Sequence, residues 1–383
     1  MRNIYLDNNA TTAVAPEVTE AMMPFFSELW GNPSSMHHFG GQVASYLEAA
    51  RAAAAGLIGA DPSEIVFTSC GTESNNTAIR GAAEAAGDSL KVITTRVEHP
   101  AVLGPCRWLG ERGYETLELG VDGSGQLDPA ELRKALAGGP ALASIMWANN
   151  ETGVVFPIQE AAEIVKEAGG IMHTDAVQAV GKLPIDVRRT PVDMLSLSGH
   201  KLHAPKGIGA LYIRRGTKVK PFLLGGHQEH GRRGGTENIP YIVGLGKACE
   251  LAARHMREEM ERVAALRDKL ERGLLASCPD TRVNGDRANR LPNTTNLSFQ
   301  YIEGESILYH LSDIGVAASS GSACTSGSLE PSHVIRAMGV PFTAAHGSIR
   351  FSLSRFNTEE EIDYVIEHMP PIIERLRALS PFV

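Results

Sequence analysis

A lysine and an aspartate each follow a short apolar segment of the sequence. Lys201 comes shortly after the run Met194–Ser198, and Asp175 closes the run Ile171–Asp175. A lysine in a turn at the end of a strand is well placed to form a Schiff base, although most lysines are solvated surface groups. A carboxylate at the C-terminal edge of a parallel sheet faces the crevice where α/β proteins bind ligands. An isolated aspartate at such a position, however, is more often a helix N-cap.

Two further segments also begin where strand-like runs end. Residues 71–76, Gly-Thr-Glu-Ser-Asn-Asn, open a helix, and backbone N–H groups and hydroxyls at a helix start suit a phosphate. Plain helix capping explains the same residues, so both interpretations stay open. The segment matches neither the dinucleotide glycine motif nor a Walker loop. His99 follows Lys91–Thr95 and could stack on or protonate a ligand, whereas a lone histidine in a turn is more often structural.

One cysteine differs from the others in its surroundings. The chain has five, which are odd in number, widely spaced and without C-x-x-C pairs: Cys70, Cys106, Cys249, Cys278 and Cys324. They predict neither a disulfide framework nor a zinc knuckle. Cys324 lies in Ser-Ser-Gly-Ser-Ala-Cys-Thr-Ser-Gly-Ser, a composition that predicts a mobile segment with little bulk to bury a thiol. Nucleophilic chemistry would explain an exposed thiol there, and we interpret the other four as structural.

Histidine pairs and an arginine-rich loop are weaker signals. The pairs His200/His203 and His227/His230 lack the H-E-x-x-H pattern, so we expect no metal site. The loop 231–238, Gly-Arg-Arg-Gly-Gly-Thr-Glu-Asn, could present an arginine or a hydroxyl to an anion. It could equally be an ordinary mobile loop.

Alternating strands and helices must position these residues. The expected strands are Ile65–Thr68, Lys91–Thr95, Glu115–Leu119, Ala143–Ala148, Ile171–Asp175, Met194–Ser198 and Gly209–Ile213. The expected helices are Asn76–Ala86, Pro100–Glu111, Pro129–Leu136 and Ile158–Ala168. This spacing predicts βαβ units around a mainly parallel sheet. The connection between the last two strands is too short for a crossover helix, so one of those strands should be antiparallel.

The pattern changes in the last third of the chain. Arg254–Leu275 is a long amphipathic segment with apolar residues spaced three and four apart. It precedes strands at Thr295–Phe299 and Ser348–Ser352, a helix at Glu305–Ser312 and a C-terminal helix from Thr358. We therefore expect a large domain of residues 14–253, with residues 1–13 and 254–383 forming a smaller α+β domain that carries Cys324.

Length and composition exclude several classes of protein. The chain has 383 residues, 43% hydrophobic and 21% charged, which fits a globular protein of about two domains. A net charge of −8 disfavours general binding to nucleic acid or anionic membranes. The sequence has no apolar run long enough for a membrane span and no signal peptide, so we expect a cytoplasmic protein. The 39 glycines indicate many turns or close backbone approaches to a ligand.

The combination of features is more specific than any one of them. An anion-binding helix start, a histidine, an aspartate and a lysine follow successive strands of one expected sheet. Pyridoxal 5′-phosphate (PLP) needs this set: a phosphate anchor, a group on the ring face, a pyridinium partner and a Schiff-base lysine. A nicotinamide dehydrogenase is disfavoured because no G-x-G-x-x-G follows an early strand.

The chain also resembles a known family along essentially its whole length. It is similar to the NifS/IscS-type cysteine desulfurases, which belong to aminotransferase class V and PLP-dependent fold type I. The resemblance rests on segments in order, among them YLDNNATT, GNPSSMHHFG, CGTESNN, EHPAV, ANNETG, HTDAVQ, SGHKLHAPKG, GRRGGTEN, SSGSACTSGSLEPSHV and SIRFSLSRF. The resemblance implies an α/β fold with a mainly parallel seven-stranded sheet and a smaller α+β domain.

The resemblance also implies residue roles at the cofactor. Lys201 would form the Schiff base, Asp175 would pair with the pyridinium nitrogen, and Gln178 would contact the ring hydroxyl. His99 would stack on the ring and act as an acid–base group. The phosphate would be bound by Gly71, Thr72, Ser198 and His200, and by Thr236 from the partner subunit of a homodimer.

The remaining implied roles concern the substrate and the sulfur. Asn150 would contact the cofactor and the substrate carboxylate region, while Asn32 and Arg350 would hold that carboxylate. The reaction would convert L-cysteine to L-alanine, and Cys324 would carry the sulfur as a persulfide to an iron–sulfur scaffold protein. A selenocysteine lyase or another fold-type I PLP enzyme is the alternative, because it would share the cofactor site without needing Cys324. A catalytically silent scaffold is a further alternative, against which the intact Lys201, Asp175 and Cys324 count.

Overall fold

A seven-stranded sheet forms the centre of the larger part of the molecule. The computed structural model describes residues 3–87, 90–320 and 331–380. The sheet order is β2 (Ile65–Thr68), β8 (Gly209–Ile213), β7 (Met194–Ser198), β6 (Ile171–Asp175), β5 (Ala141–Ser144), β3 (Lys91–Thr95) and β4 (Thr116–Leu119). The strands from β7 to β4 run parallel, whereas β8 is antiparallel to both β7 and β2. The predicted antiparallel strand is thereby confirmed.

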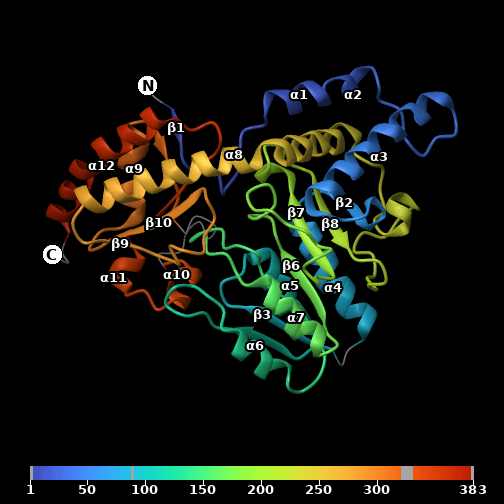
Figure 1. Cartoon of the computed structure of the whole chain (residues 1–383), viewed down its shortest axis with the longest axis horizontal. Coiled ribbons are helices and arrows are strands. Elements are labelled where there is room, and N and C mark those ends of the chain that lie inside the picture. The colour runs from blue at the N-terminus through green and yellow to red at the C-terminus, as the bar shows by residue number, and fades with distance from the viewer. Residues whose placement is uncertain (1–2, 88–89, 321–330, 381–383) are drawn as a thin grey trace.

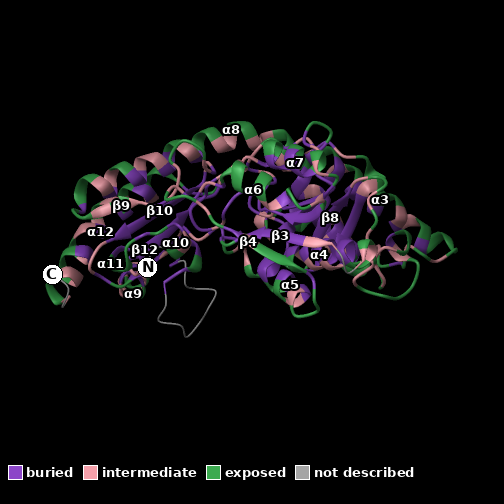
Figure 2. Cartoon of the chain, turned by 90° about the horizontal axis from the view of Figure 1, so that it is seen from below, coloured by how far each residue is buried: buried purple, intermediate pink, exposed green. Residues whose placement is uncertain are grey.

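Helices cover both faces of this sheet (Figure 1). One face packs against α4 (Gly71–Ala86) and α5 (Pro100–Gly110). The other packs against α3 (His38–Ile58), α6 (Pro129–Leu136) and α7 (Ile158–Glu167). Because successive side chains of a strand point to opposite faces, the neighbours Val92 and Ile93 lie in different apolar cores. The inner strands of the sheet are therefore buried on both sides, whereas the edge strand β4 is largely exposed (Figure 2).

A second core forms around a smaller sheet. This sheet has the order β12 (Ser348–Ser352), β10 (Thr294–Phe299) and β9 (Thr281–Val283), and all its strands are antiparallel. Its core includes side chains of α9 (Gly304–Asp313) and α12 (Glu359–Leu379). β1 (Ile4–Tyr5) pairs in parallel with β11 (Val316–Ala317), so the first residues of the chain pack with the last third.

The long helix α8 (Ile239–Ser277) runs along both cores (Figure 1). Leu245 in its first half packs in the large core, and Leu270 in its second half packs in the small one. The sequence pattern predicted only the second half. The first half packs so closely on α3 that a Cβ on Gly246 would lie 2.6 Å from Ala50. We propose that the domains divide within α8, at residues 253–254.

The other elements are short. They are α1 (Pro16–Met22), α2 (Pro24–Ser27), α10 (His333–Ala337), α11 (Phe342–Ala345) and the 3₁₀ turns η1 (Pro62–Glu64), η2 (Gly199–Lys201) and η3 (Gln228–Gly231). The predicted bounds differ most at α4, which begins at Gly71 rather than Asn76, and at β5, which spans Ala141–Ser144 rather than Ala143–Ala148. The backbone beyond β5 still follows the sheet, because the N–H of Trp147 donates to the carbonyl of Asp175.

Gly209 allows two functional segments to approach each other. A Cβ there would lie 2.8 Å from the carbonyl oxygen of Leu197 and 2.9 Å from the carbonyl carbon of Cys70. We expect Gly209→Val to lower the free energy of unfolding by about 1–3 kcal/mol, because it overpacks this junction. Urea titration would measure the change. Gly104→Ala is the control, since a Cβ at this exposed position of α5 meets nothing within 4 Å. Equal stability of the two variants would contradict the packing argument.

Candidate functional site

The end of β6 holds a buried carboxylate. Asp175 is 7% exposed, and its Oδ2 accepts a hydrogen bond of 2.7 Å from Nδ2 of Asn75 on α4. Its Oδ1 accepts from the backbone N–H of Val177 at 3.0 Å. The sequence analysis did not single out Asn75, although it lies within the segment interpreted as an anion site. These two donors fix the direction of the carboxylate.

The turn after β7 brings Lys201 to the N-terminal segment of the chain. Its Nζ donates to the carbonyl oxygen of Ala10 at 2.7 Å and also to that of Asn9. The side-chain Nε2 of Gln178 donates to the same Asn9 carbonyl at 3.0 Å. The predicted residues Lys201 and Gln178 therefore meet at one acceptor. His200 contacts this segment too, since its Nδ1 lies 3.2 Å from Oγ1 of Thr11.

An anion cradle lies where α4 begins. Gly71 and Thr72 are the first residues of that helix. A Cβ on Gly71 would lie 2.8 Å from Val177 and 3.5 Å from Cβ of Ser198, so the three segments are in contact. The buried Oγ of Ser198 has no hydrogen-bond partner within the described ranges. An orphaned hydroxyl beside the N-terminus of a 16-residue helix suits a phosphate oxygen.

His99 sits at the end of the connection from β3 and caps α5. Its Nδ1 accepts a hydrogen bond of 3.0 Å from the N–H of Ala101, which leaves Nε2 to carry the proton. Burial lowers the pKa of His99, and the charges of Asp175 and Lys201 act on it in opposite directions. His99 is therefore near both groups and is a neutral imidazole at pH 7.

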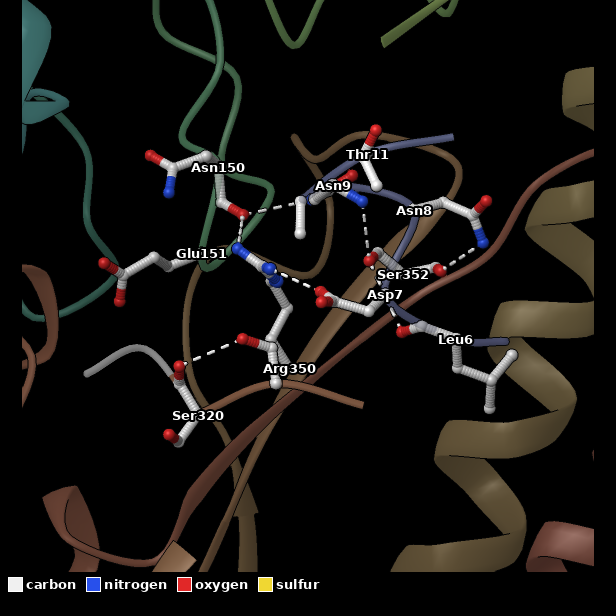
Figure 3. Close-up of polar contacts among 12 residues, drawn as sticks. Leu6, Asp7, Asn8, Asn9, Thr11, Asn150, Glu151, Ser320, Arg350 and Ser352 are labelled. Atoms are coloured by element: carbon white, nitrogen blue, oxygen red, sulfur yellow. Dashed lines mark hydrogen bonds and ion pairs between the residues drawn. The ribbon is translucent and has the colours of Figure 1, made fainter. Parts of the chain in front are cut away.

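Arg350 on β12 reaches toward the same region from the smaller sheet (Figure 3). Its Nη2 donates to Oδ1 of Asp7 at 2.6 Å, and its Nη1 donates to the carbonyl oxygen of Asn150 at 3.0 Å. Nδ2 of Asn9 donates to the same carbonyl at 3.1 Å. The buried Nε of Arg350 has no partner in the part of the chain that the structure describes. This cation can hold a carboxylate, and Asp7 was missed by the sequence analysis.

Two predicted residues stand apart from this cluster, and a third lies outside the described residues. Asn32 is exposed in the connection between α2 and α3, where its Oδ1 accepts from the N–H of Ser34 at 2.9 Å. Thr236 lines a separate cleft with Thr68 and Ser69. Cys324 lies outside the described residues. The structure thus brings together the residues predicted to bind the cofactor within one subunit.

Comparison with known proteins identifies the family. The model of the aminotransferase class-V family matches residues 4–365. The chain belongs to this family. It is 62% identical over 382 residues to a cysteine desulfurase of Trichormus azollae, covering 100% of this chain and 96% of the relative. It is 58% identical to cysteine desulfurase NifS of Azotobacter vinelandii, covering 100% and 95%. A solved NifS-like protein, 39% identical, matches with a TM-score of 0.92 and covers 98% of this chain and 100% of its own.

Aminotransferase class V enzymes depend on PLP, and the fold is that of PLP fold type I. The residues present fit the group. The orphaned hydroxyl of Ser198 at the start of α4 matches a phosphate. The buried carboxylate of Asp175 matches a protonated pyridine nitrogen, and Lys201 supplies the amine.

The pKa of His200 predicts a pH dependence of stability. Burial, reinforced by the charge of Lys201, lowers this pKa from 6.5 to about 4. The unfolded chain therefore binds the proton more readily, and the stability that neutral His200 contributes is complete above pH 6.5 and lost by about pH 4. We expect the unfolding free energy to fall over this range and His200→Gln to flatten the slope. Urea unfolding of the cofactor-free protein would measure it, and an unchanged slope would contradict the assignment.

Proposed function

We propose that this protein is a PLP-dependent cysteine desulfurase that converts L-cysteine to L-alanine and passes the sulfur on as a persulfide of Cys324. One observation carries the proposal: relatives named as cysteine desulfurases match the whole chain at 56–62% identity. The clustered lysine, aspartate and arginine supply the chemistry that this reaction needs. The alternative, a selenocysteine lyase or another enzyme of the same fold, is not favoured by these relatives.

We assign the cofactor contacts as follows. When bound, PLP supplies an electron sink for the charge that develops at the substrate α-carbon. Lys201 would attach the cofactor through Nζ, Asp175 would pair with the ring nitrogen and His99 would cover the ring. Gln178 and Asn150 contact the ring substituents. The phosphate takes donors from Gly71, Thr72, Ser198 and His200, and from Thr236 of the partner subunit.

The substrate is held by its carboxylate. Arg350 offers a buried guanidinium whose Nε has no partner within the described ranges. Asn32 is exposed and stands apart from Arg350, so we assign it no contact with the substrate. Nζ of Lys201 would accept the α-proton, because the same amine would hold the cofactor. His99 moves protons at Nε2, which is free to do so because Nδ1 accepts the N–H of Ala101.

Cys324 completes the transfer. Its thiolate attacks the substrate sulfur, so that an S–S bond forms while the C–S bond breaks. The electron pair of the C–S bond stays with Cβ, which takes up a proton, and the α-carbon regains the proton held by Lys201, so that alanine leaves. The sulfur atom remains on Cys324 as a persulfide, ready for an acceptor.

We further propose a cytoplasmic homodimer that supplies an iron–sulfur scaffold protein. Several large apolar side chains are exposed in one stretch of sequence and one loop, namely Met23, Phe26, Trp30, Met36 and Leu224. Exposed apolar side chains of this kind support a protein interface. The cleft at Thr236 adjoins the start of α4, where the phosphate is proposed to bind. The name NifS among the relatives supports the iron–sulfur role. None of the described helices is long and apolar enough to cross a bilayer.

The test supplies the PLP-loaded protein with L-cysteine and a thiol reductant, and measures alanine and sulfide together. We expect equal amounts of both products. Cys324→Ala should keep the bound cofactor but lower both rates by more than about 100-fold, because the nucleophile is removed.

Two variants serve as controls. Cys106→Ala removes a thiol that is 1% exposed and whose pKa burial raises to about 12, so desulfuration should persist. Lys201→Ala should stay folded but lose turnover, because no amine attaches the cofactor or takes the α-proton. Full sulfide release by Cys324→Ala would overturn the persulfide role and favour the selenocysteine-lyase alternative.

A further inference from the structure

Lys182 is a buried lysine beside the proposed site. It follows β6 in the chain and is 8% exposed. Its Nζ donates to the backbone oxygen of Gln178 at 3.0 Å and to Oε1 of the same residue at 3.1 Å. No carboxylate of the described residues pairs with it, as would be usual for a buried ammonium group. A lysine buried in this way beside a proposed site is a candidate for a functional role.

The contact decides which way the Gln178 amide faces. A lysine amine donates hydrogen bonds, so the atom of the amide that faces Lys182 must be the oxygen. The Nε2 end then points the other way, where it donates to the Asn9 carbonyl at 3.0 Å. That carbonyl also accepts from Lys201, so Nε2 is the end of the amide directed at the cofactor site.

We propose that Lys182 is a positioning residue, which holds the Gln178 amide so that its NH₂ group, not its oxygen, faces the ring oxygen of PLP. The inference rests on the proposed function and deepens it. If the Gln178 amide were turned over, its Oε1 would face the ring oxygen of PLP. Because both oxygens accept, the hydrogen bond between Gln178 and the ring would be lost. Lys182 thus raises the affinity for the cofactor without touching it.

The donor role does not depend on the charge of the amine. Burial, with the charges of Lys201 and Arg350, lowers the pKa of Lys182 to about 7. Both the ammonium and the neutral amine carry N–H donors, so either form can hold Oε1, but only the ammonium, which has no lone pair, excludes the turned amide. A methionine has a similar length and no desolvation cost, so Lys182→Met should leave the thermal stability unchanged or raise it. Stability and cofactor affinity are therefore expected to move independently.

The experiment measures equilibrium binding of PLP to cofactor-free protein, by fluorescence, together with the absorption spectrum of the bound cofactor. We expect Lys182→Met to weaken PLP binding about tenfold, as for one lost hydrogen bond to a charged oxygen, and to shift the visible band. In a Gln178→Leu background, the same substitution should have no further effect, because Lys182 acts through the amide. Lys166→Met is the matched control: Lys166 pairs with Asp193 at 2.8 Å, so its loss should lower stability but leave PLP affinity unchanged.

The role of Lys182 and the proposed function can each be overturned by a different result. Wild-type affinity and spectrum in Lys182→Met would overturn the proposal, as would an equal weakening in the Gln178→Leu background. Lys182→Leu removes the same donors with a smaller side chain, so the cycle can be completed with it if the methionine variant melts early. Wild-type protein that binds no PLP would instead refute the proposed function.

Discussion

The carbonyl oxygen of Asn9 accepts hydrogen bonds from both Lys201 and Gln178, and the geometry of the site depends on this shared acceptor. The N-terminal segment that presents it is held from two sides. The N–H of Asn9 donates to Oγ of Ser352 on the smaller sheet, while Thr12 donates to the carbonyl of His200 after β7. One short stretch of backbone therefore sets the distance between the proposed cofactor amine and the strand that carries Arg350, the proposed substrate-binding arginine.

The same segment links the charges of the site. Asp7 pairs with Arg350 and so orients its guanidinium group. The Nε of Arg350 has no hydrogen-bond partner among the described residues. Burial lowers the pKa values of Lys182 and His200, and the charge of Lys201 adds to both effects. The positive charges of Lys201 and Arg350 favour anionic ligands in this region. A phosphate and a carboxylate are the groups that the proposed reaction brings to it.

The positions of the chemical groups along the chain could be predicted from sequence. Asp175 and Lys201 follow short apolar runs, and the bounds of β6 and β7 agree with the expected segments. Local signals suffice there because strand periodicity and turn residues act over a few positions. The pairs Asn75–Asp175 and Asp7–Arg350 join residues far apart in sequence, so no local pattern indicates them. The first half of α8 was missed because close packing on α3 replaces the amphipathic pattern with small residues. The role of Lys182 depends on an amide orientation that only the fold defines.

The proposed reaction moves sulfur from cysteine onto a thiol of the chain itself. Mass spectrometry of the PLP-loaded protein after brief exposure to L-cysteine, without reductant or acceptor, tests it most directly. The account predicts that the peptide containing Cys324 gains one sulfur atom while one alanine is released per subunit. Alanine formed with no added sulfur on that peptide, or no alanine at all, would contradict it.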